Sequence, residues 1–176
     1  MFGELAPLFG LQPNISYLSL CGVSPYNAMV GPSSALWPAA NLAIFHPIRL
    51  AVPVTVTKFW LINGATAAGN VDIGIYDLNG YRIASTGSTA QGTVSVLQSI
   101  DVTDFTIGPG GFYLAMALDN GTATSLSNSM TAIQTRELGL AEMAAAFPLP
   151  ATATLAVVST AAIRLHLFGL SRRVTV

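Results

Sequence analysis

Apolar and polar side chains alternate with a period of two through the middle of this chain. The segment Val71–Tyr76 has valine or isoleucine at every second position, with Asp72 and Gly74 between them. Such alternation is typical of a β-strand that buries one face. Val54–Ile62 consists mainly of β-branched and aromatic residues and is an equally strong strand candidate. We predict further strands at Ala43–Leu50 with a break at Pro47, Tyr81–Ser85, Thr93–Val102, Phe105–Ile107, Phe112–Leu118, Thr154–Ser159 and Ala162–Phe168.

Turn sequences separate these strands at near-regular intervals. They are Asn63-Gly64, Asp77–Gly80, Gly108–Gly111 and Asn120-Gly121, and residues of these types accept the backbone angles of tight turns. Short strands joined in this way favour an antiparallel β-sandwich. The sequence therefore predicts an all-β, jelly-roll-like sandwich over residues 43–176.

One short helix is expected within this domain, from about Ala132 to Ala146. Apolar residues recur there with rough helical spacing, and Pro148 and Pro150 end the pattern. Gly139 weakens the prediction, because glycine is unfavourable inside a helix.

A weak internal similarity links two strand ends. Residues 59–70 and residues 113–128 each contain an apolar run, then Asn-Gly, then a loop rich in threonine and alanine. Two related transitions from strand to loop would be consistent with corresponding corners of a sandwich. The other explanation is a chance match.

The first 42 residues have a different composition. Five prolines and four glycines are spread along them, which disfavours both a helix and a central strand. The same segment is rich in large apolar side chains, whereas free disorder accompanies low hydrophobicity. We therefore expect an extended arm that wraps its own domain or docks on a neighbouring subunit. Its candidate interface residues are Phe2, Leu5, Leu8, Phe9, Leu11, Tyr17 and Trp37.

Trp60 is the candidate interface residue of the strand region. It follows Phe59 in one predicted strand, so the two side chains face opposite sides of the sheet. One of the two is therefore expected outside the core. An exposed aromatic ring there would serve a subunit interface or a carbohydrate platform, and the interface is the favoured interpretation.

Charge is scarce throughout the chain. Only 9% of the residues are charged and 52% are hydrophobic, whereas a soluble domain carries roughly 25% charged residues. One lysine and six arginines form no basic stripe, so nucleic acid is not expected as a partner. The longest late apolar stretch contains Arg164, which argues against a membrane span. We expect much of the surface to be covered by other protein in a homo-oligomer or larger assembly.

The residue types that serve in catalytic and metal-binding sites are present, but their spacing along the chain does not match such sites. The aspartates of the strand region fit neither the carboxylate pair of a glycosidase nor a calcium loop; Asp77, Asp104 and Asp119 are expected to cap turns. His46 and His166 lie far apart without a nucleophile motif and are expected to be structural. Cys21 is the single cysteine, so an internal disulfide is excluded. We therefore predict no catalytic, cofactor or metal-ligating residue, and no enzyme.

Part of the strand region resembles a known group of proteins. The runs VTVTKFWLINGATAAGNVDIGIYDLNGYRIASTGSTA (residues 54–90) and GGFYLAMALDN (residues 110–120) resemble small β-sandwich virion proteins of tailed bacteriophages. Such sandwiches serve as capsid decorations, tail-fibre heads and baseplate parts, and a symmetric trimer is common among them. The resemblance supplies no catalytic residue.

The resemblance and the scarcity of charge together lead to two hypotheses. The first is a structural virion subunit, a capsid decoration or cement protein that holds neighbouring capsid or tail subunits together. The alternative is a carbohydrate-binding receptor module of a tail fibre or baseplate, with a host glycan as its ligand.

Overall fold

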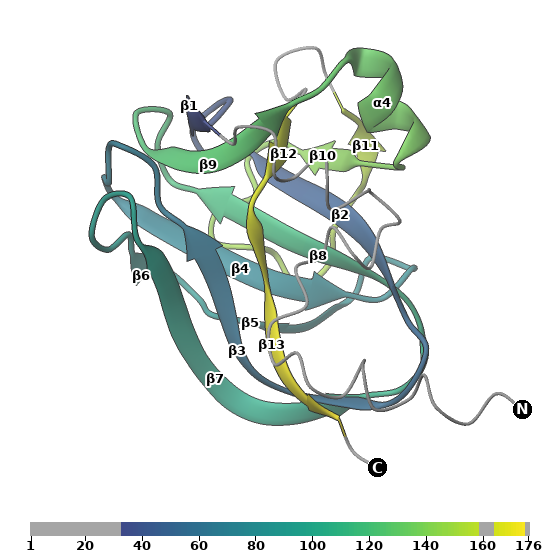
Figure 1. Ribbon diagram of the computed structural model, residues 1–176. Helices are drawn as coiled ribbons and strands as arrows, with labels where there is room; N and C mark the ends of the chain where they lie inside the picture. The colour runs from purple at the N-terminus through teal and green to yellow at the C-terminus, as the bar shows by residue number, and fades with distance from the viewer. Residues whose placement is uncertain (1–32, 159–163, 175–176) are drawn as a thin grey trace, which may run out of the picture.

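The computed structural model describes residues 33–158 and 164–174 (Figure 1). Within these ranges the chain forms one helix and thirteen antiparallel strands. The helix is α4 (Ala132–Glu137). The strands are β1 (Ser33–Leu36), β2 (Ala43–Leu50), β3 (Val54–Ile62), β4 (Asn70–Tyr76), β5 (Arg82–Ser85), β6 (Thr89–Ala90), β7 (Leu97–Ile107), β8 (Gly110–Leu118), β9 (Thr124–Ser129), β10 (Ala141–Met143), β11 (Ala156–Val157), β12 (Arg164–His166) and β13 (Phe168–Val174).

The strands are arranged in two facing layers (Figure 1). One layer, sheet B, has the order β11-β10-β2-β8-β4-β5, and β6 also pairs with β4. The other layer combines the sheets β1-β9-β12 and β13-β3-β7. A bridge between Asn63 and Ser125 joins these two sheets, as does the hydrogen bond from the Leu167 N–H to the Leu126 carbonyl. The predicted antiparallel β-sandwich is confirmed, whereas its jelly-roll-like character stays a prediction.

The main core fills the space between the two layers. Alternation along β4 directs Val71, Ile73 and Ile75 into it, as a period of two requires. The facing layer contributes large side chains such as Phe59 and Phe168, both fully buried. The residues that alternate in the sequence are therefore those that hold the two sheets together.

Two predicted interruptions of strands are wrong. Strand β2 continues through Pro47, which pairs with Tyr113 of β8. On its other side β2 pairs with β10 only at residues 43–45, so Pro47 needs no N–H there. Likewise residues 97–107 form a single strand, β7, whose register shifts opposite Val56 and Lys58. A bulge lets a ladder continue where the sequence pattern changes phase.

The predicted helix begins at the expected residue and ends early. Thr131 caps α4, and its side chain and that of Gln134 form a reciprocal capping box. The helix ends at Glu137, and Gly139 takes a positive φ of 69°, an angle that glycine adopts without strain. Residues 141–143 then form strand β10 rather than continuing the helix.

The segment of residues 144–155, called the strap below, covers the outer face of sheet B. Beneath it lies a second apolar cluster, separate from the main core. Its members are Ala43, Phe45, Tyr76, Ala115, Ala117 and Ala141 of the sheet with Ala146, Leu149 and Ala153 of the strap. A face that a sandwich commonly leaves to water is therefore buried by the chain itself.

The sandwich begins before the predicted boundary at residue 42. Strand β1 pairs along its whole length with β9, and Leu42 is a member of the main core. Residues 33–42 are therefore part of the β-sandwich. Residues 1–32 of the predicted arm lie outside the described residues.

Candidate functional site

The predicted interface residues fall into two groups. Phe2, Leu5, Leu8, Phe9, Leu11 and Tyr17 lie outside the described residues. Trp37 and Trp60 are described, and both are buried.

Trp37 is a core residue, which corrects its expected place at an interface. Its side chain is 1% exposed and its indole N–H donates to the Leu42 carbonyl at 2.9 Å. Its ring lies 4.6 Å from that of His166 between centroids. The pairing of β1 with β9 brings Trp37 back over the core, a long-range effect that the local proline-rich sequence does not reveal.

Trp60 is also buried, with 6% of its surface exposed. Phe59 belongs to the main core whereas Trp60 does not, so the two face opposite sides of β3 as predicted. The indole of Trp60 lies over Gly169 of β13, where a Cβ would come within 2.4 Å of the ring. Because glycine leaves this space open, the ring lies against the sheet. The expectation that Trp60 is exposed for an interface or a sugar is therefore wrong.

A serine–histidine pair lies inside the main core. Ser125 Oγ and His166 Nδ1 are 2.6 Å apart, and both residues are fully buried. A nucleophile and its base need this spacing, but a substrate also has to reach them. Burial lowers the pKa of His166 to about 3, with a further contribution from the Arg164 charge. The imidazole is therefore neutral, and the pair is a structural contact between β9 and β12.

His46 of β2 is a second buried histidine. Its ring lies 4.7 Å from the ring of Phe168. Burial lowers the pKa of His46 to about 3, and nearby His166 acts in the same direction. Both histidines of the chain are thus uncharged residues of the core.

Asp72 is a buried carboxylate that holds the strap. Its Oδ2 accepts a hydrogen bond from the Leu149 N–H at 2.9 Å, and its Oδ1 accepts one from the Thr86 hydroxyl at 3.2 Å. Burial raises the pKa of Asp72, although these hydrogen bonds and the Arg82 charge act in the opposite direction. The Tyr76 hydroxyl donates to the Pro150 carbonyl nearby, and burial raises the pKa of this tyrosine too.

Other aspartates have local structural roles. Asp77 Oδ1 accepts from the N–H groups of Asn79 and Tyr81, so its predicted role as a turn cap is confirmed. Asp119 instead accepts from the N–H and the side chain of Asn70, which ties the start of β4 to the residue that follows β8. Asp101 forms an exposed ion pair with Lys58 at 2.8 Å.

Two loop exits that resemble each other in sequence lie side by side. The Gly64 N–H donates to the Thr124 carbonyl, and the Thr124 N–H donates to the Thr66 carbonyl. The side chain of Asn120 adds a bond to the Ala68 carbonyl. These contacts make one end of the sandwich a closely bonded corner.

Metal-ion binding receives no support from the described part of the chain. Within residues 33–158 and 164–174, no group of three or more histidine, cysteine, aspartate or glutamate residues lies close enough to hold an ion.

Several exposed apolar side chains follow one another along the chain beside that corner. Val94, Val96 and Leu97 are between 45% and 51% exposed. Leu97 pairs with the half-buried Ile62 of β3, and the Val96 carbonyl accepts from the Asn63 N–H. We call Ile62, Val94, Val96 and Leu97 the β7 patch. Neither charge nor hydrogen-bonding capacity is present in these four side chains.

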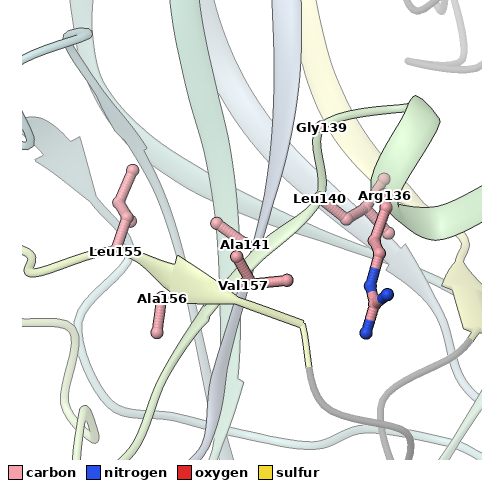
Figure 2. Close-up of a pocket in the computed structure, with 7 residues that line it drawn as sticks. All are labelled: Arg136, Gly139, Leu140, Ala141, Leu155, Ala156 and Val157. Carbon is pink, nitrogen blue, oxygen red and sulfur yellow. The ribbon is translucent and has the colours of Figure 1, made fainter. Parts of the chain in front are cut away.

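A second apolar surface is a hollow of about 400 Å³ beside α4 (Figure 2). We call it the α4 hollow. It is lined by Arg136, Gly139, Leu140, Ala141, Leu155, Ala156 and Val157. In the view of Figure 2, Leu155 lies at one side and Arg136 at the other, with Ala141 and Val157 between them. The lining is therefore aliphatic, with one cationic group.

Neither a protein-family model nor a curated protein matches this chain. Across the described ranges, no helix combines the length and the apolar character needed to cross a membrane.

Proposed function

We propose that this chain is a non-catalytic structural subunit that assembles with other protein subunits. The observation that carries the proposal is the presence of two apolar surfaces, the β7 patch and the α4 hollow, on a domain with few charges. Exposed apolar groups that cluster are characteristic of protein contact sites. Single exposed apolar residues would not support the same conclusion.

The placement of the reactive side chains also supports a structural role. The Ser125–His166 pair and His46 are enclosed in the main core, and Asp72 is engaged by the strap. These groups stabilise the fold where they lie. They are not arranged around the α4 hollow, whose lining contains neither histidine nor a carboxylate among the described residues.

The architecture of the domain is consistent with a rigid structural subunit. Its layers are joined by a continuous core, and the strap fixes the outer face of sheet B by hydrogen bonds. Such a body can present several modest contacts at fixed positions, and repeated contacts add through avidity.

We further propose, on the resemblance of residues 54–90 and 110–120, that the assembly is the virion of a tailed bacteriophage. Capsid decoration is the role that best combines a small rigid sandwich with apolar contact surfaces. The experiment removes the protein from particles and measures survival under heat and low salt alongside adsorption to the host. Loss of particle stability with unchanged adsorption supports decoration, and the reverse result contradicts it and favours the glycan-binding alternative.

A test on the purified chain addresses assembly itself. We expect self-association in light scattering and sedimentation, weakened by Leu97→Asp in the β7 patch or by Val157→Asp in the α4 hollow. Because both side chains are about half exposed or more, either change should leave the fold intact. Leu78→Asp is the matched control, since Leu78 is exposed but belongs to neither surface. A chain that stays monomeric and binds no particle contradicts the proposal.

A further inference from the structure

The α4 hollow is an open depression with a mainly aliphatic lining. We propose that it binds the Phe2–Leu11 segment of a neighbouring copy of this chain. The inference rests on the proposed function as an assembly subunit and gives that assembly a specific contact.

The first argument is apolar complementarity. The hollow is lined by Leu140, Leu155 and Val157 among smaller residues, and Val157 is 69% exposed. Ile133, three positions before Arg136 on α4, is 72% exposed and extends the same surface along the helix. The segment Phe2–Leu11 supplies two phenylalanines and three leucines. Burying such side chains against this lining removes apolar area on both sides from water.

The second argument is charge complementarity. Arg136 is the only charged residue that lines the hollow within the described ranges. The ion pair found among the described residues joins Lys58 and Asp101 and does not involve Arg136. Residues 1–32 contain a single charged residue, Glu4, which lies between Phe2 and Leu5. One carboxylate within an apolar segment thus matches one guanidinium at the margin of an apolar hollow, and arginine pairs well with carboxylates.

The third argument is reach. The described chain begins at Ser33 in β1, whose partner strand β9 leads into α4. The residues between Glu4 and Ser33 span up to roughly 100 Å when fully extended. This length reaches the hollow of an adjacent copy across a small domain, so geometry does not limit the contact.

The proposal is tested by site-specific photo-cross-linking in the full-length chain. p-Benzoylphenylalanine replaces Val157, and isotopically light and heavy copies are mixed before irradiation. We expect mass spectrometry to find cross-links from position 157 to peptides within residues 1–12, joining light to heavy copies. The same probe in place of Leu78, which is 62% exposed, is the control and should not label that peptide.

Three results would overturn the proposal. They are cross-links from position 157 that avoid residues 1–12, cross-links to residues 1–12 only within one copy, and equal labelling from position 78. The second result would show that the segment docks on its own domain.

A charge exchange provides an independent test. Glu4→Arg and Arg136→Glu should each weaken association between copies by about 2- to 5-fold, as expected for an exposed ion pair. The double variant should recover most of that loss, because the pair is restored with its charges reversed. Additive losses in the double variant would contradict the pairing.

These experiments separate the inference from the proposed function. If the copies associate but position 157 and the charge pair have no effect, the proposed contact is wrong while the assembly role stands. If the copies do not associate and the chain binds no particle, the proposed function itself fails.

Discussion

The two faces of sheet B are built on opposite plans. The inner face carries large aliphatic residues, represented by Ile73 of β4 and Met116 of β8. The outer face carries alanines and a glycine at the neighbouring positions, and its aromatic residues are Phe45, Tyr76 and the half-buried Tyr113. Asp72 lies on this outer face, between two inward-facing residues of the same strand.

The difference follows from what covers each face. The inner face meets a second sheet, and facing sheets lie about 10 Å apart, so large side chains are needed to fill the gap. The outer face meets a single irregular segment, the strap, whose backbone comes close because alanines allow it. Hydrogen bonds to Asp72, Tyr76 and Arg82 satisfy strap backbone groups that have no strand partner. Small residues and polar anchors thus replace bulk where one segment covers a sheet.

At neutral pH, truncation on the inner face should have the largest effect. Ile73→Ala should lower the free energy of unfolding by about 2–5 kcal/mol, because it leaves a cavity between two sheets that cannot close. Urea denaturation measures the change, and Leu78→Ala on the surface is the control, expected within about 0.5 kcal/mol of the wild type. A loss below about 1 kcal/mol for Ile73→Ala would contradict a rigid, filled core.

Acid should destabilise the inner face through its histidines. The folded pKa values of His46 and His166 are about 3, below the ordinary value of 6.5. The stability that the two neutral histidines provide is therefore fully present above pH 6.5. It is lost as the pH falls toward the folded pKa values. Each histidine should contribute a slope of about 1.4 kcal/mol per pH unit in this window. Urea denaturation at several pH values measures this pH dependence of the free energy of unfolding. His166→Gln should remove about half of the slope. An unchanged slope in this variant would exclude His166 as a source.

Adding volume on the outer face should have an intermediate effect. A Cβ at Gly74 would lie 2.8 Å from the Ala84 carbonyl oxygen and 3.1 Å from Leu149. Gly74→Ala should therefore lower the free energy of unfolding by about 1–3 kcal/mol and loosen the strap, which hydrogen exchange at Leu149 can detect. Gly108→Ala is the matched control, since a Cβ at that position would meet nothing within 4 Å. Equal stability of the two variants would show that the strap adapts easily.

The outer face should respond to pH in the opposite direction, and by less. Burial raises the folded pKa of Asp72 above its ordinary value of 3.8. The stability that the protonated Asp72 provides is therefore fully present below pH 3.8. It declines as the pH rises through the raised pKa. Asp72→Asn keeps an acceptor for the Leu149 N–H but cannot ionise. The difference in stability between wild type and this variant should thus shift against the wild type as the pH rises; a constant difference would contradict a raised pKa.

The inner face could be predicted from the sequence, whereas the outer face could not. Alternation in Val71–Tyr76 and Val54–Ile62 identifies β4 and β3, because burial between two sheets leaves a period of two. The strap left no comparable pattern. The rough helical spacing of apolar residues just before it, from Leu138 to Ala144, predicts a helix, but α4 ends at Glu137 and Gly139 takes a positive φ.

The positions of the exposed apolar residues could not be predicted from the sequence. Scarcity of charge was the reason to expect contact surfaces, but which apolar residues are exposed depends on strand pairing between distant residues. β9 has a polar sequence of threonine, serine and asparagine, so its place as the partner of both β1 and β12 left no local signal. That pairing buries Trp37. Trp60 is buried because its indole occupies the space left open above Gly169 of β13. The β7 patch and the α4 hollow emerged only from the exposure of residues such as Val96 and Val157.

The strap also has a consequence for how the chain is made. The hydrogen bonds that fix it join residues 67, 74 and 77 positions apart. During synthesis the outer face of sheet B therefore stays uncovered until the ribosome has released the strap, well after β4 and β8. Contacts of such long sequence separation form slowly. A nascent chain stalled before residue 144 should thus be a target for chaperones that recognise exposed apolar sheet.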